Sequence, residues 1–418
     1  MAKKPNIRFA GFEDDWEQRK LGEIMVSLQN NTLSRANLSN ETGIAKNVHY
    51  GDVLIKFGEV LDVSEESLPM ISDEGVLTKY KASFLQNGDV IVADTAEDST
   101  VGKCCEIAGL NDEVVLSGLH TIPYRPIEKF ASGYLGYYLN SSAFHKQLIP
   151  LMQGIKVTSI SKSAMQDTDI VYPKSLEEQG KIGNFFQFID HIITLHQRKC
   201  DELKKVKKFM LQKMFPKKGD KNPEIRFDGF TNDWEQRKLG DIIIEYKETV
   251  DSDCTLPILT SSKTEGVILQ EEHFGRKQQH DITGYNILPR NYCTYRNRSD
   301  GVDFTFNINK CCDKGIISKF YPVFSGKNSD VFFLSLVLNN SEEVVREIAY
   351  TCTGTGQKVL SFLDLQKMKV RVPNFDEQKE IAAYFESLDH LITLHQRKCE
   401  ELKNVKKYML QNMFAKGE

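Results

Sequence analysis

Basic, amide, aromatic and hydroxyl side chains gather in two short runs of the second half of the chain. One run contains Arg290, Tyr292, Tyr295, Arg296, Asn297, Arg298 and Ser299, and the other contains Arg276, Lys277, Gln278 and Gln279. Arginine can pair with a guanine edge and Asn or Gln with an adenine edge, whereas Lys, Arg and hydroxyl groups suit phosphates. These runs are therefore candidate nucleic-acid contacts, and the simpler alternative for each is a solvated turn.

The first half of the chain offers a smaller set of the same kind. Its candidates are Thr95, Ser99, Thr100 and Lys103, followed by Lys156, Thr158, Ser159 and Ser161 in a later loop. By position in an internal repeat, their counterparts in the second half are Gly354, Gly356, Gln357, Lys358 and Ser361. Lysine and hydroxyl side chains in such loops are suited to phosphate contacts.

The chain carries no motif that marks a catalytic site. Gly102 and Lys103 lack the earlier glycine and the Ser or Thr of a phosphate-binding loop, and there is no H-E-x-x-H or G-x-S-x-G. We also find no Asp/Asn-Pro-Pro-aromatic run of the kind that amino-methyltransferases use. The nine cysteines include no C-x-x-C spacing, which favours reduced thiols over a zinc site. Unless distant residues assemble a site, we expect no catalysis, no bound cofactor and no metal.

The chain is an internal repeat with two unlike inserts. Residues 8–24 recur as 226–242 with 13 of 17 positions identical, and residues 194–215 recur as 393–414 with 18 of 22 identical. The segments between them, 25–170 and 243–370, share little. Nearly identical frames that carry different inserts are typical of a protein that reads two different things through one geometry. Trp16 and Trp234, at equivalent positions of the frame, are predicted to be packing anchors.

Each repeat ends in a long predicted helix. Residues 177–215 contain no proline, Pro216 follows directly, and apolar residues alternate at spacings of three and four. This is the pattern of a coiled-coil seam, and such a helix is about 55 Å long. Two helices so alike are expected to pack antiparallel around a pseudo-twofold axis. The register then brings His196 and His395 face to face, within about 12 Å, either as a polar layer or as a metal or pH site.

The inserts have the mixed pattern of short β-branched runs, turns and helices. We therefore expect an α+β fold: two globular α/β domains, separated by a pair of long antiparallel coiled-coil helices. The predicted boundaries are 1–175 and 216–373 for the globular domains, and 176–215 and 374–418 for the helices. The start of the chain has no apolar signal segment, and the longest apolar run, 331–338, is too short to span a bilayer. A cytoplasmic protein is expected.

On these features the chain resembles the specificity (S) subunits of type I restriction-modification enzymes. The resemblance covers essentially the whole chain and rests on the doubled frame, the W-E-Q-R-K-L-G entry to each variable half, and the glycine loop, strand, proline and E-Q pair that lead into each helix. The segments 88–95, 101–103 and 118–122 are also similar to the target-recognition domains of that family.

The resemblance implies a function, partners and cofactors. Each variable domain would read one half of a split, asymmetric site in double-stranded DNA, while the helices act as a spacer and dock two methyltransferase subunits. Motor-nuclease subunits would join that complex. S-adenosylmethionine, ATP and magnesium would be used by the partner subunits and not by this chain. A stand-alone enzyme or a coiled-coil adaptor that does not bind DNA are the alternatives.

Charge is distributed unevenly, although the formal net charge is only −4. Residues 25–175 carry 12 basic and 18 acidic groups, residues 243–373 carry 16 of each, and residues 198–218 carry nine basic and two acidic groups. Positive potential is therefore local. We expect the isolated chain to bind DNA weakly and to gain much of its affinity from partner subunits.

Overall fold

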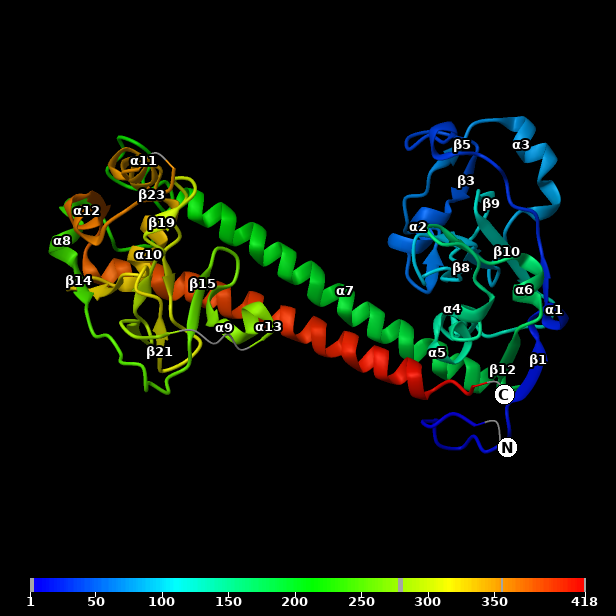
Figure 1. Ribbon diagram of the computed structural model, residues 1–418. Helices are drawn as coiled ribbons and strands as arrows, with labels where there is room; N and C mark the ends of the chain where they lie inside the picture. The colour runs from blue at the N-terminus through cyan, green and yellow to red at the C-terminus, as the bar shows by residue number, and fades with distance from the viewer. Residues whose placement is uncertain (1–3, 277–280, 355, 417–418) are drawn as a thin grey trace. The chain divides into compact units, whose positions relative to one another are not determined.

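The computed structural model describes residues 4–276, 281–354 and 356–416, and its internal contacts divide the chain into two compact units. The first unit consists of residues 1–197 and 397–418, and the second of residues 198–396. The division falls inside both long helices, so each unit contains one insert and one end of each helix (Figure 1). This grouping differs from the predicted boundaries, which gave each helix a segment of its own.

The two long helices are α7 (Leu176–Lys213) and α13 (Phe375–Asn412), each of 38 residues. Within each unit their ends run antiparallel. The rings of Phe186 and Phe414 lie 5.7 Å apart in the first unit, and those of Phe215 and Phe385 lie 6.3 Å apart in the second. An ion pair across the helices accompanies each contact: Lys406 with Asp190, and Lys207 with Asp389. Because these are equivalent positions of the repeat, the predicted antiparallel packing is confirmed within each unit.

The predicted apolar seam is only partly correct. Val206 and Val405 were placed in it by their spacing, but both side chains are exposed. Met214 and Met413, eight residues further along the chain, are buried, so the departure from the seam is local. His196 and His395 are each half-buried. They belong to different units, and their facing each other stays a prediction.

The first unit contains four sheets. They are β1–β12; the five-stranded β2-β10-β6-β8-β4; β7–β11; and β5-β3-β9. The strand bounds are β1 (Glu17–Lys20), β2 (Met25–Ser27), β3 (Ala45–Val48), β4 (Val60–Asp62), β5 (Met70–Ile71), β6 (Val90–Ala93), β7 (Thr95–Ala96), β8 (Cys104–Ala108), β9 (Val115–Ser117), β10 (Thr121–Pro126), β11 (Thr158–Ser159) and β12 (Asp169–Tyr172).

Short helices cover these sheets. They are α1 (Leu21–Ile24), α2 (Tyr50–Ile55), α3 (Glu74–Lys79), α4 (Tyr134–Asn140), α5 (Ser142–His145) and α6 (Lys162–Gln166). Residues 132–148 have the sequence pattern of one helix, but the structure has two there, α4 and α5. The chain is extended at Ser141, where the hydroxyl donates to the carbonyl of Tyr138 at 2.6 Å, and this ends α4.

The second unit has a different set of sheets on the same frame. They are β13–β24, the four-stranded β14-β22-β18-β20, β15–β16, β17–β21 and β19–β23. The strand bounds are β13 (Glu235–Lys238), β14 (Ile243–Tyr246), β15 (Leu259–Ser262), β16 (Gly266–Leu269), β17 (Asn286–Pro289), β18 (Cys293–Thr294), β19 (Arg298–Ser299), β20 (Asn307–Ile308), β21 (Lys314–Ile317), β22 (Val323–Gly326), β23 (Lys358–Val359) and β24 (Lys369–Val372). The helices are α8 (Leu239–Ile242), α9 (Gln270–Phe274), α10 (Val331–Asn340), α11 (Glu342–Thr351) and α12 (Phe362–Lys367).

A buried ion pair explains why the two frames share their residues. In the first unit, Arg8 forms two hydrogen bonds to Glu178, at 2.6 and 2.9 Å, and the indole N–H of Trp16 donates to the same carboxylate at 3.3 Å. The second unit repeats the arrangement with Arg226, Trp234 and Glu377. Both tryptophans are buried, which confirms them as packing anchors. A buried carboxylate needs all of these donors, since losing one partner leaves a charge unpaired.

The glutamine that follows each of these glutamates ties the insert to the helix. Gln179 donates to the carbonyl of Pro173 at 2.8 Å and accepts from the backbone N–H of Ala131 at 3.0 Å. In the second unit, Gln378 donates to the carbonyl of Pro373 at 2.9 Å and accepts from Ser329 at 2.6 Å. The E-Q pair thus fixes the start of each long helix against its own insert.

Segments near the two ends of the chain meet in the first unit. The backbone N–H of Ile7 donates to the carbonyl of Asn412 at 2.9 Å. At the equivalent place in the second unit, Ile225 donates to the carbonyl of Lys213 at 3.0 Å. The same contact therefore joins the two termini in one unit and the two ends of a continuous linker in the other.

Candidate nucleic-acid interface

Each unit contains a short antiparallel ladder built from the same two parts of the repeat. In the first unit β7 pairs with β11, and in the second β19 pairs with β23. One residue further along, Ile160 N–H donates to the carbonyl of Asp94 at 2.9 Å, and Leu360 N–H donates to that of Asn297 at 3.0 Å. This register makes Asp94 equivalent to Asn297. The next residue of the first unit, Thr95, is therefore equivalent to Arg298 of the second.

A glycine turn precedes the second strand of each ladder. Gly154 has φ +119° and Gly354 has φ +103°. A Cβ atom at Gly154 would lie 1.9 Å from the carbonyl oxygen of Val157, and one at Gly354 would lie 2.2 Å from that of Gln357. Both positions therefore require glycine, on conformational and steric grounds. The two units therefore share this glycine conformation and the ladder register, although the sequences that follow the glycine differ.

The first unit presents several of its predicted residues to solvent. Thr95, in the ladder, donates to Asp94 at 2.7 Å. Ser99 and Thr100 are exposed on the loop that follows, and Thr100 donates to Asp98 at 2.6 Å. This hydroxyl holds the pKa of Asp98 below its usual range, so the loop stays anionic at neutral pH. Lys156 and Ser159 are exposed on or beside the glycine turn. Thr158 is half-buried in the ladder, where it pairs with Ala96.

His120 lies beside this ladder. Its ring Nδ1 is 3.5 Å from the Asp94 carboxylate and 3.5 Å from the Thr95 hydroxyl, and its backbone has φ +55°. A left-handed histidine is uncommon and is held there by its surroundings. A single histidine between apolar residues is usually a buried core residue, as the neighbours Leu119 and Ile122 of His120 would suggest. Instead, the side chain is exposed beside two polar residues.

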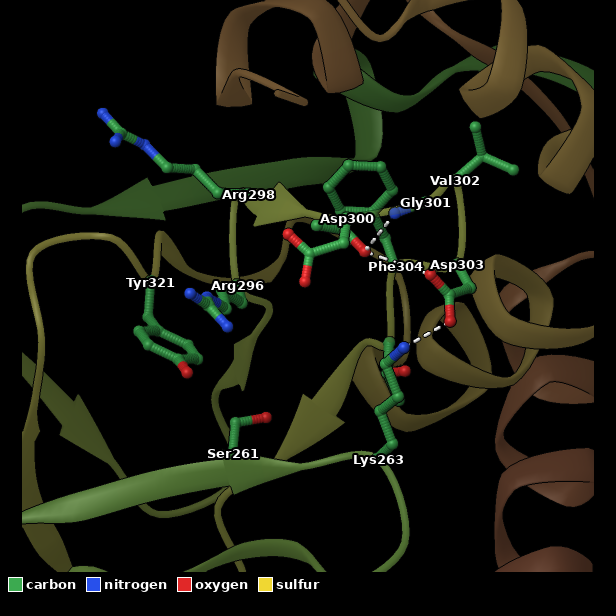
Figure 2. A pocket seen from close by; sticks show the side chains of 12 residues that line it. Ser261, Lys263, Arg296, Arg298, Asp300, Gly301, Val302, Asp303, Phe304 and Tyr321 are labelled. Carbon is green, nitrogen blue, oxygen red and sulfur yellow. Dashed lines mark hydrogen bonds and ion pairs between the residues drawn. The ribbon is translucent and has the colours of Figure 1, made fainter. Parts of the chain in front are cut away.

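In the second unit, three predicted residues line one cavity of about 700 Å³ (Figure 2). They are Arg296, Arg298 and Ser299. The cavity is completed by residues that the sequence did not indicate: Ser261, Lys263, Asp300, Gly301, Val302, Asp303, Phe304, Thr305 and Tyr321. Ser261 and Lys263 come from the β15–β16 hairpin. Their separation from Arg296 along the chain carries no signal, so only the fold brings them together.

The loop after β19 is fastened on both sides. Ser299 donates to Asp303 at 3.0 Å, and Lys263 forms an ion pair with the same carboxylate. Both contacts lower the pKa of Asp303, and the contact with Lys263 has the larger effect. Gln357, from the glycine loop, donates to Asp300 at 3.4 Å. The exposed Gly354 and Gly356 belong to that loop, next to the ladder.

Several predicted contact residues instead have structural roles. Tyr295 is fully buried, with its ring 4.8 Å from that of Phe306 and its hydroxyl donating to Leu360 at 3.1 Å. Tyr292 is half-buried against Tyr246, with ring centroids 5.1 Å apart. The surface prediction was wrong for Tyr295, which directly follows strand β18 and is buried together with Cys293 and Thr294.

Four further candidates are engaged with the protein itself. Lys103 donates to the carbonyls of Leu54 and Phe57, at the end of α2, at 2.9 and 3.1 Å, so its ammonium group is directed inward. Ser161 and Ser361 accept the N–H groups of Ala164 and Asp364 and cap α6 and α12. Lys358 donates to the carbonyl of Gly354 at 2.9 Å and closes the glycine loop.

The remaining candidates lie away from the ladder or are not described. Arg290 is bound to Asp313 at 2.7 Å and to the carbonyl of Lys310 at 2.9 Å, at the opposite end of β18 from Arg296. Arg276 is exposed just after α9. Lys277, Gln278 and Gln279 lie outside the described residues.

The described residues contain neither a metal-binding cluster nor a membrane-spanning helix. Among residues 4–276, 281–354 and 356–416, no group of three or more His, Cys, Asp or Glu side chains is arranged to hold a metal ion. Within the same ranges, no helix has the length and apolar character needed to cross a membrane.

The chain is similar to known proteins along most of its length. A family model described as the type I restriction modification DNA specificity domain matches residues 13–205 and again residues 231–404. One relative is a protein of Methanocaldococcus jannaschii that is inferred to be the specificity subunit of the type I restriction enzyme MjaX. The two sequences are 24% identical over 436 aligned residues, which cover 97% of this chain and 94% of that one. The MjaVIII specificity subunit of the same organism is 23% identical and covers 64% of this chain and 65% of its own.

Among solved structures, the chain is similar to the S subunit of a type I restriction-modification system from M. genitalium. The TM-score is 0.61 at 11% sequence identity, over 99% of this chain and 100% of that one. This likeness shows a common fold. The two matches of the family model coincide with the two halves of the repeat and together cover most of the chain. The chain therefore belongs to the family of type I restriction modification DNA specificity domains.

Proposed function

We propose that each unit of this DNA-recognition subunit reads one half of a bipartite, asymmetric site in double-stranded DNA. The observation that carries the proposal is the pair of matched ladders, which have the same backbone register but different side chains. Where the first unit presents Asp94 and Thr95, the second presents Asn297 and Arg298. Because the side chains at and around one register differ, the two units offer DNA different donors and acceptors, and the two half-sites should differ in sequence.

The proposed partners are two methyltransferase subunits and, in the complete enzyme, motor-nuclease subunits. Support comes from apolar side chains that are exposed on the long helices and occur twice. Leu195, Val405 and Tyr408 belong to the first unit, and the equivalent Leu394, Val206 and Phe209 belong to the second; all six are exposed. Exposed apolar groups on a charged helix surface favour a protein partner. Because the surface is repeated, it suits two copies of the same partner.

In this proposal the chain itself performs no catalysis. Methyl transfer from S-adenosylmethionine and the ATP- and magnesium-dependent steps belong to the partner subunits. The long helices set the length of the unread spacer between the two half-sites. Recognition without turnover agrees with the mixed, solvent-facing donors and acceptors of both ladders, which suit hydrogen bonds to base edges and phosphates.

The test is methylome sequencing of cells that express the chain together with its methyltransferase subunit. The expected result is adenine methylation within one motif that has two unlike specified halves and an unspecified spacer. The chain without the methyltransferase is expected to give no methylation and only weak, salt-sensitive gel shifts. A palindromic motif, or one uninterrupted motif, contradicts the two-reader proposal. Methylation by the purified chain alone contradicts its non-catalytic role.

A further inference from the structure

The cavity beside β19 contains a mixture of positive and negative side chains. Its positive groups are Arg296, Arg298 and Lys263, and its carboxylates are Asp300 and Asp303. Lys263 and Asp303 bind each other, and Asp303 also accepts from Ser299 at 3.0 Å. This pair is therefore satisfied within the protein and fastens the loop after β19. The exposed charged groups that remain for a ligand are the two arginines and Asp300, which also accepts from Gln357 at 3.4 Å.

The two arginines point in different directions. Figure 2 shows the guanidinium group of Arg296 turned toward Tyr321, inside the cavity, while Arg298 extends away from it. The guanidinium carbon of Arg298 lies 4.5 Å from the ring centroid of Phe320. Stacking of this kind restrains an arginine and leaves its N–H edge available. Within the described residues, neither Arg296 nor Arg298 forms an ion pair.

The neighbourhood of Arg296 favours a base edge over a phosphate. A phosphate is attracted by uniformly positive groups, and the exposed carboxylate of Asp300 in the same cavity repels it. A base pair presents both acceptors and donors in the major groove. Arginine suits O6 and N7 of guanine, and a carboxylate accepts from the N4 amino group of cytosine.

We propose that Arg296 and Asp300 are the specificity-determining residues for a G·C base pair in the half-site that the second unit reads. Arg296 donates to guanine, and Asp300 accepts from a cytosine amino group of the same or the adjacent pair. Arg298, at the edge of the cavity with its guanidinium group held on Phe320, contacts the DNA backbone. This inference rests on the proposed DNA-reading function and adds the base that is read and the residues that read it.

The experiment is methylome sequencing of the complete methyltransferase complex with single substitutions. R296A is expected to relax one position of one half-site, with discrimination for G over other bases falling roughly 5- to 150-fold. The other half-site and the spacer are expected to stay unchanged. D300N is expected to relax the same or the neighbouring position. R298A is expected to lower methylation at all sites alike and to leave the motif unchanged.

Two controls separate this inference from the underlying function. R290A removes an arginine that is bound to Asp313 at 2.7 Å and to a backbone carbonyl, and it should leave the motif intact. R296K keeps the charge but loses the two-pronged donor, and it should lose discrimination for G while the complex still assembles. If R296A and R296K both leave the motif unchanged, or weaken all sites equally, the assignment is overturned. If wild type and R290A give no bipartite motif, the proposed function itself fails.

Discussion

At the scale of single residues, one buried carboxylate makes the first unit sensitive to pH. Glu106 is buried and accepts the backbone N–H groups of Gly133 and Gly136, at 2.6 and 3.0 Å, at the start of α4. Burial raises the pKa of Glu106 to about 7, although these N–H groups partly oppose the rise. The folded chain therefore retains this proton at pH values where the unfolded chain has released it.

The raised pKa of Glu106 makes the folded first unit less stable as pH rises toward 7. Between the ordinary pKa near 4.5 and the folded value near 7, the unfolded state binds fewer protons, so the free energy of unfolding falls as pH rises. The glutamine variant E106Q removes this titration. The difference in unfolding free energy between E106Q and wild type should move in favour of the variant by about 2 kcal/mol from pH 5 to pH 8. Denaturant titrations at several pH values measure this difference.

Glu113 provides the matched control. It is exposed, and its hydrogen bond to Lys46 lowers its pKa instead of raising it. The stability it contributes is present above its unfolded pKa and is lost only at more acid pH. E113Q should therefore show a constant difference from wild type between pH 5 and pH 8. Parallel pH dependences for E106Q and E113Q would show that Glu106 does not titrate as its burial implies.

Residue types predicted the interface better than they predicted which of its members face solvent. Arg296 and Arg298 were singled out by their chemistry, and the structure exposes both. Tyr295 was grouped with them, but it directly follows the buried strand β18 and is itself fully buried. Ser161 and Ser361 look like phosphate-binding hydroxyls in sequence, yet each caps a helix. A hydroxyl at a helix start has a local backbone partner that composition alone does not reveal.

At the scale of elements, the long helices were the most predictable part of the fold. The absence of proline and the three–four spacing predicted both, and Pro216 marked the end of the first. The inserts were predicted only as mixed α/β. Their strands are short, β7 and β19 having two residues each, and their partners lie far away in the sequence. Such pairing depends on tertiary contacts, which local patterns do not encode.

The helices also allow a direct test of the spacer hypothesis. The division into units falls after Gln197 in α7 and after Gln396 in α13. Four residues inserted at each of these two points keep the contacts within both units. They lengthen each helix by about 6 Å, against about 3.4 Å per base pair. The methylated motif should gain one or two unspecified base pairs and keep both half-sites.

The control insertion belongs in the linker. Gly219 is exposed with φ +89°, and nothing lies within 4 Å of a Cβ built there. Four residues inserted after it leave both helices at their present length, so the motif should not change. A longer spacer from this variant, or changed half-sites from the helix variant, contradicts a helix-determined spacer.

At the scale of the whole molecule, the repeat predicted two like frames with unlike inserts, and the structure shows the contacts that attach each insert to its frame. Each insert is attached to its frame by a ladder of the same register, β1 with β12 and β13 with β24. The E-Q pair and the buried arginine–glutamate pair then fix the start of each long helix. Because these attachments are the same in both units, an insert can differ without disturbing the frame.

An exchange of inserts tests this modularity. Replacing residues 243–373 by the corresponding insert of another family member should change the sequence of one half-site only. The other half-site and the spacer length should stay unchanged in the methylome.

The structure sets two requirements for the insert that is brought in. Its last strand must pair with β13 in the register that joins Glu235 to Val372. It must also provide two groups that donate hydrogen bonds to Gln378, as the Ser329 hydroxyl and the Asp330 backbone N–H do here. A donor that lacks them should fail to assemble, which loss of methylation at every site reports. If a donor that meets both requirements alters both half-sites, the two units do not read DNA independently. The reciprocal exchange of residues 25–175 should change only the other half-site, because each proposed base contact comes from one unit's insert.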